Sequence, residues 1–321
     1  MAHPSSPMHL LIPFAGRRTP ACQAVLSRLQ LPNLDALLTR LAVLHDDTQP
    51  DTTLSPPHER ALGRALGLEG ADGLLPWAAR EAQRTGLSRA GSNEPWGVFT
   101  LCHWEVAIDE VVLDDPADMA IDEAESQALL EAARPFFQED GIVLRRSGAP
   151  GRWLARGEMF RSLPSASVDR AAGRPISEWA PLTDALKPLR KLQNEMQMLL
   201  YTQRVNDERI ARGVPPINSF WLSGTGVLGT APSAAEGPTV DTSLRTPALR
   251  DDALAWTAAW QALDAGPVAE LLAAYRQGTA VQLTLCGDRS ARQFGVQPRG
   301  PLGWFKNLLN RTQATTVLAS L

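Results

Sequence analysis

Apolar residues open the chain as one short run and then recur at helical spacing. His9–Gly16 reads His-Leu-Leu-Ile-Pro-Phe-Ala-Gly, which predicts a buried strand that ends in a loop. Pro20 and Pro32 each stand where a helix can begin, and the leucines of Leu34–Leu41 follow the second proline on one helical face. The chain is therefore expected to begin with strand, loop and helix.

The middle of the chain mixes strand and helix patterns. Val98–Val112, rich in Val, Ile, Phe and Trp, predicts one or two strands, and Asp122–Phe137 predicts an amphipathic helix. Gly141–Leu144 and Arg152–Ala155 flank a turn marked by Gly and Pro, so they predict a hairpin. This region is expected to be α+β.

The last third of the chain returns to alternating helices and strands. From Pro188 onward, apolar residues at helical spacing predict a helix that buries Met196, and Ile217–Leu222 predicts a strand that runs into a Ser-Gly-Thr-Gly loop. Gly229–Pro247 is rich in small residues and proline and predicts a mobile loop or linker. Two helices and a strand are then expected, at Asp251–Leu263, Pro267–Arg276 and Ala280–Leu285.

These patterns predict an α/β fold with two parts. Helix alternates with strand at both ends of the chain, which favours one α/β core built from residues 1–95 and 225–321. Residues 96–224 are expected to form an inserted α+β domain.

Ser55 precedes two prolines and His58, a sequence typical of a helix start. The serine oxygen is expected to accept a backbone N–H of the first turn, while the prolines fill early positions that need no donor. A nucleophile and base formed by Ser55 and His58 is the alternative, but this local spacing places no third catalytic group.

Composition and charge disfavour several kinds of partner and location for this protein. A net charge of −4 with interleaved acids and bases gives little basis for binding nucleic acid. The apolar run near residue 8 is short and cut by Pro13, and no stretch approaches a membrane span, so a cytoplasmic protein is expected. The three cysteines lie far apart without a Cys-x-x-Cys pair, which disfavours zinc or disulfides and indicates buried apolar residues.

Two tryptophan segments raise the question of surface contacts. Trp256 and Trp260 share a helical face and either pack in the core or form a surface for a partner protein. Gly303–Arg311 has the pattern of an interfacial helix, but it carries few basic residues, which favours packing on the core over membrane binding.

One segment carries a family likeness. Asn206-Asp-Glu-Arg209, Gly213-Val-Pro-Pro-Ile-Asn218 and Trp221-Leu-Ser-Gly-Thr-Gly226 resemble the archaeal-type cofactor-independent phosphoglycerate mutases of the alkaline phosphatase superfamily. An early Leu-Pro-Asn-Leu-Asp-Ala-Leu phrase resembles the opening of that superfamily. The resemblance implies a phosphoglycerate-mutase-like core with an inserted substrate domain.

Gly151-Arg-Trp-Leu also resembles a Tyr-Arg phrase of these mutases, and together these positions suggest an anion site for a small phosphorylated or carboxylated metabolite. Arg152 and Arg209 offer planar donors matched to phosphate or carboxylate, and Asn206 and Asn218 add directional donors. The alternative is that the asparagines turn the chain and the arginines lie on a solvated face.

The metal chemistry that the resemblance implies is not supported by the residues. Phosphomutases of this type use a serine nucleophile and two metal ions with Asp and His ligands. Where relatives carry an Asp-Gly loop, this chain has Ile12–Gly16, and where they carry Asp-His, it has Leu285–Arg289. No histidine follows His103, and Leu163-Pro-Ser-Ala stands where relatives have Pro-Pro-His. We therefore expect no catalytic residue, no metal site and no cofactor.

The whole chain also resembles the RpfE-type regulatory proteins, a bacterial family. The shared phrases stand at residues 11–15, 54–60, 193–202 and 218–224, although Tyr201-Thr-Gln-Arg204 replaces the family's Tyr-Thr-His-Pro. Together these observations favour a regulatory or ligand-sensing protein, with a regulatory protein as a further partner, on a phosphomutase-like scaffold that has lost its metal site. A phosphomutase or phosphatase with a rebuilt site and a protein-interaction module without a small ligand are the alternatives.

Overall fold

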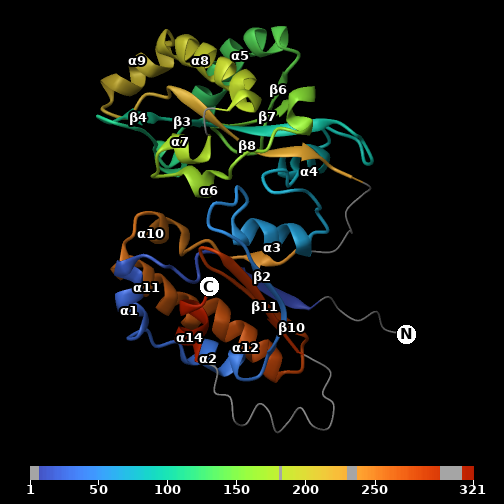
Figure 1. The fold of residues 1–321 in the computed structure, drawn as a ribbon, viewed down its shortest axis with the longest axis vertical. Coiled ribbons are helices and arrows are strands. Elements are labelled where there is room, and N and C mark those ends of the chain that lie inside the picture. Colours follow the sequence, from blue (N-terminus) through green and yellow to red (C-terminus); the bar gives the residue numbers. More distant parts are fainter. Residues whose placement is uncertain (1–6, 181–182, 230–236, 297–312) are drawn as a thin grey trace. The chain divides into compact units, whose positions relative to one another are not determined.

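The computed structural model describes residues 7–180, 183–229, 237–296 and 313–321, and the chain forms two compact units (Figure 1). The first unit contains residues 1–52, 56–67 and 233–321, and the second contains residues 53–55 and 68–232. The expected boundaries near residues 95 and 225 differ from these, since residues 68–95 group with the second unit. Both units combine helices and strands, so the α/β class predicted from the sequence is confirmed.

The first unit is built on a five-stranded sheet in the order β2-β11-β10-β1-β9. Strands β10, β1 and β9 run parallel, whereas β11 pairs antiparallel with β10 and β2 pairs antiparallel with β11. The strands are β1 (Met8–Ile12), β2 (Ala42–Thr48), β9 (Thr239–Val240), β10 (Val281–Cys286) and β11 (Ser290–Gly295). β9 lies inside the segment expected to be a linker. The sequence does not predict this strand, because two residues are too few to form a recognisable pattern.

Strand β1 is buried on both faces, as its continuous apolar run predicts. Leu10 and Ile12 pack with the larger helical layer, whereas Leu11 packs on the opposite face with Ala61 of α3 (Pro57–Ala65). The helices of the larger layer are α1 (Pro20–Leu26), α2 (Pro32–Leu38), α10 (Arg245–Leu249), α11 (Ala253–Leu263), α12 (Ala269–Arg276) and α14 (Ala314–Ala319). Between α11 and α12 the chain makes one π-helical turn, Asp264–Val268.

Trp256 and Trp260 belong to this core and not to a partner surface. Both side chains are fully buried on α11 and meet edge to face, with ring centroids 6.2 Å apart. Their indole N–H groups donate to the carbonyls of Phe14 and Ala15, each at 3.1 Å. Burial of both rings and both N–H groups overturns the interpretation of this face as a docking surface.

The second unit contains a four-stranded antiparallel sheet in the order β6-β7-β3-β8. Its strands are β3 (Pro95–Cys102), β6 (Val143–Arg146), β7 (Arg152–Arg156) and β8 (Ser219–Val227), and the predicted hairpin of β6 and β7 is confirmed. Strand β8 extends through the Ser-Gly-Thr-Gly segment expected to be a loop. Thr225 keeps the segment in place by donating its hydroxyl to the Leu163 carbonyl at 2.6 Å.

Helices cover both faces of this sheet. On one face, α5 (Glu123–Glu139) and α8 (Lys187–Tyr201) pack on Phe99 and Phe220, whose rings stack with centroids 4.1 Å apart. On the other face, alanines of α4 (Trp77–Arg84) pack on Trp96 and Val98. The remaining elements are β4 (Trp104–Val106), β5 (Val111–Leu113), α6 (Val168–Ala171), α7 (Ile176–Trp179), α9 (Arg204–Ala211) and the 3-10 turns Pro116–Met119, Glu158–Arg161 and Asp184–Leu186.

Three smaller predictions can be compared with the structure. The helix after Ser55 starts at Pro57, but Pro56 occupies the N-cap position and the Ser55 hydroxyl accepts the Gly73 N–H at 3.0 Å, so the expected cap is wrong. Cys22, Cys102 and Cys286 are buried and free, as expected. Gly303–Arg311 lies outside the described residues.

Within the described ranges, no helix has the length and apolar character that crossing a membrane requires.

Candidate functional site

The carboxyl ends of β9, β1 and β10 meet at one edge of the first unit's sheet, which is where ligands usually bind in open α/β folds. At this edge the backbone of Phe14 adopts φ 56, a left-handed conformation that is unusual for a residue with a bulky side chain. The Ala15 N–H donates to the Cys286 carbonyl at 2.6 Å, and the ring of His58 lies 5.1 Å from the Phe14 ring. The loop after β1 is therefore fixed from several sides.

The chain itself fills part of this edge. Leu321 is 2% exposed and packs against two loop glycines, Gly16 and Gly287. A Cβ on Gly16 would lie 2.4 Å from the Leu318 carbonyl oxygen, and one on Gly287 would lie 2.5 Å from the Leu321 Cβ. Only glycine lets α14 and Leu321 approach the two loops so closely.

The polar residues at this edge do not fit a dinuclear metal centre. The carboxylate of Asp288 is paired with the guanidinium of Arg17 and accepts the Arg18 N–H at 2.8 Å. Asp241, which follows β9, accepts the N–H and hydroxyl of Ser243 at 2.9 and 2.6 Å. Among the residues that the structure describes, no three His, Cys, Asp or Glu side chains gather as metal ligands would.

In the second unit, the predicted anion-binding residue Arg209 is 1% exposed and its guanidinium bonds to the chain. Nε donates to the Pro215 carbonyl at 2.8 Å, Nη1 to the Glu125 carboxylate at 2.8 Å, and Nη2 to the Met119 carbonyl at 2.7 Å. Arg212 also pairs with Glu125. These bonds join α9 to the start of α5, where Glu125 also completes a capping box with Asp122.

The other three predicted residues are also bonded within the chain. Asn206 donates to the Leu200 and Ile217 carbonyls at 2.8 and 2.7 Å and accepts the Ile217 N–H. Asn218 accepts the Trp104 N–H at 2.7 Å and donates to its carbonyl at 3.0 Å.

Arg152 lies on β7, 3.3 Å from Glu81 of α4 and 42% exposed. The structure therefore brings Asn206, Arg209 and Asn218 into one region around α9, whereas Arg152 belongs to the face of the sheet that α4 covers.

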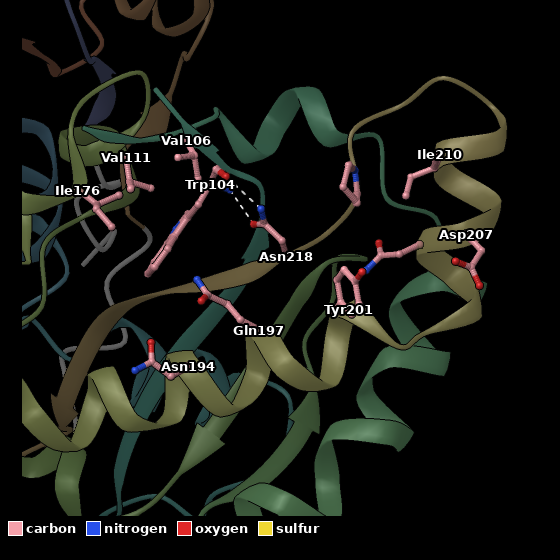
Figure 2. A pocket seen from close by; sticks show the side chains of 12 residues that line it. Trp104, Val106, Val111, Ile176, Asn194, Gln197, Tyr201, Asp207, Ile210 and Asn218 are labelled. Atoms are coloured by element: carbon pink, nitrogen blue, oxygen red, sulfur yellow. Dashed lines mark hydrogen bonds between the residues drawn. The ribbon is translucent and has the colours of Figure 1, made fainter. Parts of the chain in front are cut away.

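Beside this region the second unit contains a cavity of about 810 Å³ (Figure 2). This volume is in the range of pockets that hold drug-sized molecules. Half of its lining is apolar: Trp104, Val106, Val111, Ile176, Ile210 and Pro216. The other half is polar: Asn194, Gln197, Tyr201, Asn206, Asp207 and Asn218.

The polar lining residues divide into bonded and free groups. The side-chain amides of Asn206 and Asn218 are hydrogen-bonded to backbone groups. The side chains of Asn194 and Gln197 make no hydrogen bond to another described residue, and Asp207 forms no ion pair within the described ranges. A ligand would therefore meet two free amides and one free carboxylate.

Little in the sequence pattern predicts this cavity. Asn194 and Gln197 stand three residues apart on α8, so they share a helical face, and that spacing is the one local signal. Trp104 and Ile176 belong to other elements, and their approach to α8 depends on how the chain folds.

Two solved structures are similar to the chain. The cofactor-independent phosphoglycerate mutase of Thermoplasma acidophilum is 16% identical, with 98% of this chain and 99% of that chain covered and a TM-score of 0.37. The PH0037 protein of Pyrococcus horikoshii is 13% identical, with 90% and 87% covered and a TM-score of 0.42. No protein-family model and no curated protein matches the chain. Likeness at this level says nothing of activity, so the chemistry is taken from this chain's own residues.

Proposed function

We propose that the chain is a regulatory, ligand-sensing protein that binds a small molecule in the cavity of its second unit and performs no metal-dependent phosphotransfer. The observation that carries the proposal is the cavity, whose volume of about 810 Å³ and mixed apolar and polar lining suit a small ligand. Free amides at Asn194 and Gln197 supply the directional contacts that selective binding needs.

The carboxyl edge of the first unit supports the second half of the proposal. Metal-assisted phosphotransfer needs carboxylates that are free to hold cations. Here Asp288 is neutralised by Arg17, and Leu321 packs on the glycines of both loops. A phosphorylated substrate at this edge would have to displace the chain's own residues.

A thermal-shift screen with metabolites tests ligand sensing, because a molecule that binds only the native state raises the melting temperature. Metal analysis and assays with 3-phosphoglycerate and p-nitrophenyl phosphate, with and without Mn²⁺, test the absence of phosphotransfer. We expect at least one stabilising metabolite, no tightly bound transition metal and no turnover. Two tightly bound ions per chain together with turnover would establish the enzyme alternative.

A protein-interaction module is the second candidate function. Three residues of the cavity lining are strongly exposed: Val106 at 80%, Tyr201 at 87% and Ile210 at 62%. Apolar side chains gathered on a rim are typical of contact surfaces. This candidate predicts that no small molecule stabilises the native state and that charged substitutions at Val106 or Ile210 abolish partner binding without lowering the melting temperature.

A further inference from the structure

We infer that the cavity of the second unit selects an uncharged, planar heteroaromatic ligand with hydroxyl groups, as in a nucleoside, over its phosphorylated form. This inference rests on the proposed ligand-sensing function and names the class of ligand. Three features of the lining carry it: a wall that contains one indole, two free amides on one helix face, and no cationic side chain among the described residues that line the cavity.

The indole of Trp104 provides a flat apolar wall at one end of the cavity. Figure 2 shows its side chain extending from β4 between Val111 and Ile176 on one side and Gln197 of α8 on the other. Asn218 fixes the strand at this point, because its side-chain amide bonds to both the N–H and the carbonyl of Trp104. A base or similar ring can stack on such a surface, and Asn218 holds the backbone that carries the indole.

The two amides can form hydrogen bonds with donors and acceptors at the edge of a planar ring. Asn194 and Gln197 lie one turn apart on α8, and Figure 2 shows both side chains on the side of the helix that faces Trp104. Each amide has one donor group and one acceptor oxygen, and neither is used by another described residue. Nucleobases carry donors and acceptors in the plane of the ring, so they match a pair of amides better than an alkyl chain does.

The electrostatics of the lining disfavour a phosphate. Among the described residues that line the cavity there is no Lys, Arg or His, and Asp207 is the one formally charged side chain. Neither Arg209, which is bound to Glu125, nor Arg204, which pairs with Glu208 at 2.7 Å, is among the lining residues. A phosphate in the cavity would meet the like charge of Asp207 and no opposite charge among these lining residues. Asp207 can instead accept hydrogen bonds from ligand hydroxyl groups.

Calorimetry with adenosine, guanosine, cytidine and uridine, and with their 5′-monophosphates, tests the inference. We expect at least one nucleoside to bind with Kd below about 1 mM and its monophosphate to bind at least about tenfold more weakly. The double variant Asn194→Leu with Gln197→Leu should weaken nucleoside binding at least about tenfold, because it removes the groups that read the ring edge. Asp207→Asn should reduce the difference in affinity between a nucleoside and its monophosphate.

Met198→Ala is the matched control, since Met198 lies on the same helix, is 75% exposed and does not line the cavity. Its nucleoside affinity should equal that of the parent chain. A monophosphate that binds as tightly as its nucleoside, an unaffected double variant, or no binding by any of the four nucleosides would overturn the inference.

Failure of the inference and failure of the proposed function give different results. If another metabolite stabilises the parent chain and this effect is lost in the double variant, the cavity senses a ligand of another class and the proposed function stands. If no small molecule stabilises the parent chain, both proposals are wrong and the interaction module becomes the better interpretation.

Discussion

Leu321 occupies the space that a side chain on Gly287 would need. A Cβ built on Gly287 would lie 2.5 Å from the Leu321 Cβ and 2.6 Å from its carbonyl carbon. The loop after β10 and the segment after α14 are thus fitted to each other through a glycine, at the edge of the sheet where a ligand site is usually found.

The first prediction follows from this fit. Gly287→Ala should lower the free energy of unfolding by about 1–3 kcal/mol, since backbone atoms of Leu321 must move to make room for the methyl group. Urea denaturation measures the change. Gly148→Ala is the control, because Gly148 has no atom near its hypothetical Cβ and no positive φ. Equal stability of the two variants would show that Leu321 does not rest on Gly287 in solution.

A second prediction concerns the core of the second unit. Met196 of α8 is 1% exposed between the sheet and α5, so Met196→Asp should cost about 3–5 kcal/mol by placing an unpaired charge among apolar side chains. Met198 lies two residues along the same helix and is 75% exposed, so Met198→Asp should hardly change the free energy of unfolding. Thermal melts of the two variants compare the helix faces directly, and similar melting temperatures would mean that α8 is rotated from the orientation described.

Arg209 gives the third prediction. Removal of its guanidinium leaves Glu125 without one of its two arginine partners and two carbonyls without donors, so Arg209→Ala should cost about 3–5 kcal/mol. Arg209→Lys keeps the charge but cannot make all three hydrogen bonds of the guanidinium, so we expect an intermediate loss of stability. Arg204→Ala should change stability by less than about 1 kcal/mol, because the Arg204–Glu208 pair is exposed. Urea denaturation of the three variants measures their free energies of unfolding and tests this order.

The residues around Arg209 show how far sequence patterns reach. The apolar periodicity of α8 identifies its buried face, whereas the order of Asn206, Arg209 and Asn218 does not show which groups these side chains bind. The partner of Arg209 could not be predicted, because Glu125 lies 84 residues away and nothing local links the two. Anion binding by Arg152, Asn206, Arg209 and Asn218 stays a prediction that the internal bonds of these side chains make less favourable.

Long-range packing also limits what the sequence reveals at both candidate sites. The fold class follows from local periodicity, and the buried strand β1 follows from its continuous apolar run. The Leu321 contact joins residues 34 positions apart, from Gly287 onward, and a contact of Gly16 with the same residue spans almost the whole chain. The cavity similarly draws its walls from β4, β5, α7, α8 and α9. Such contacts depend on volumes and shapes that periodicity does not record.

The fourth prediction concerns the thiols. Burial raises the pKa of Cys22, Cys102 and Cys286, so each should remain protonated and unreactive in the native chain. A disulfide reagent such as 5,5′-dithiobis(2-nitrobenzoic acid) should label almost no thiol in buffer and all three in urea. Rapid labelling of one thiol without urea would indicate that the surrounding element opens easily.

The last prediction is a pH dependence that originates at His9 on β1. Burial lowers the pKa of His9 from 6.5 to about 4, and its Nε2 lies 2.8 Å from the Thr284 hydroxyl of the neighbouring strand. Between pH 6.5 and about 4 the unfolded chain binds a proton at this residue that the folded chain does not, so stability falls as the pH falls through that window. Because part of the ring remains in contact with water, we expect a loss of about 1–2 kcal/mol, less than the full shift implies.

Urea denaturation of the parent chain and of His9→Gln between pH 7 and 5 isolates this contribution, because the acids and the other histidines titrate in both proteins. The glutamine side chain keeps a polar group near Thr284 but cannot take up the proton. The parent should lose more stability than the variant as the pH is lowered. Parallel curves would mean that the His9 side chain is solvated and does not pack beside Thr284 of β10.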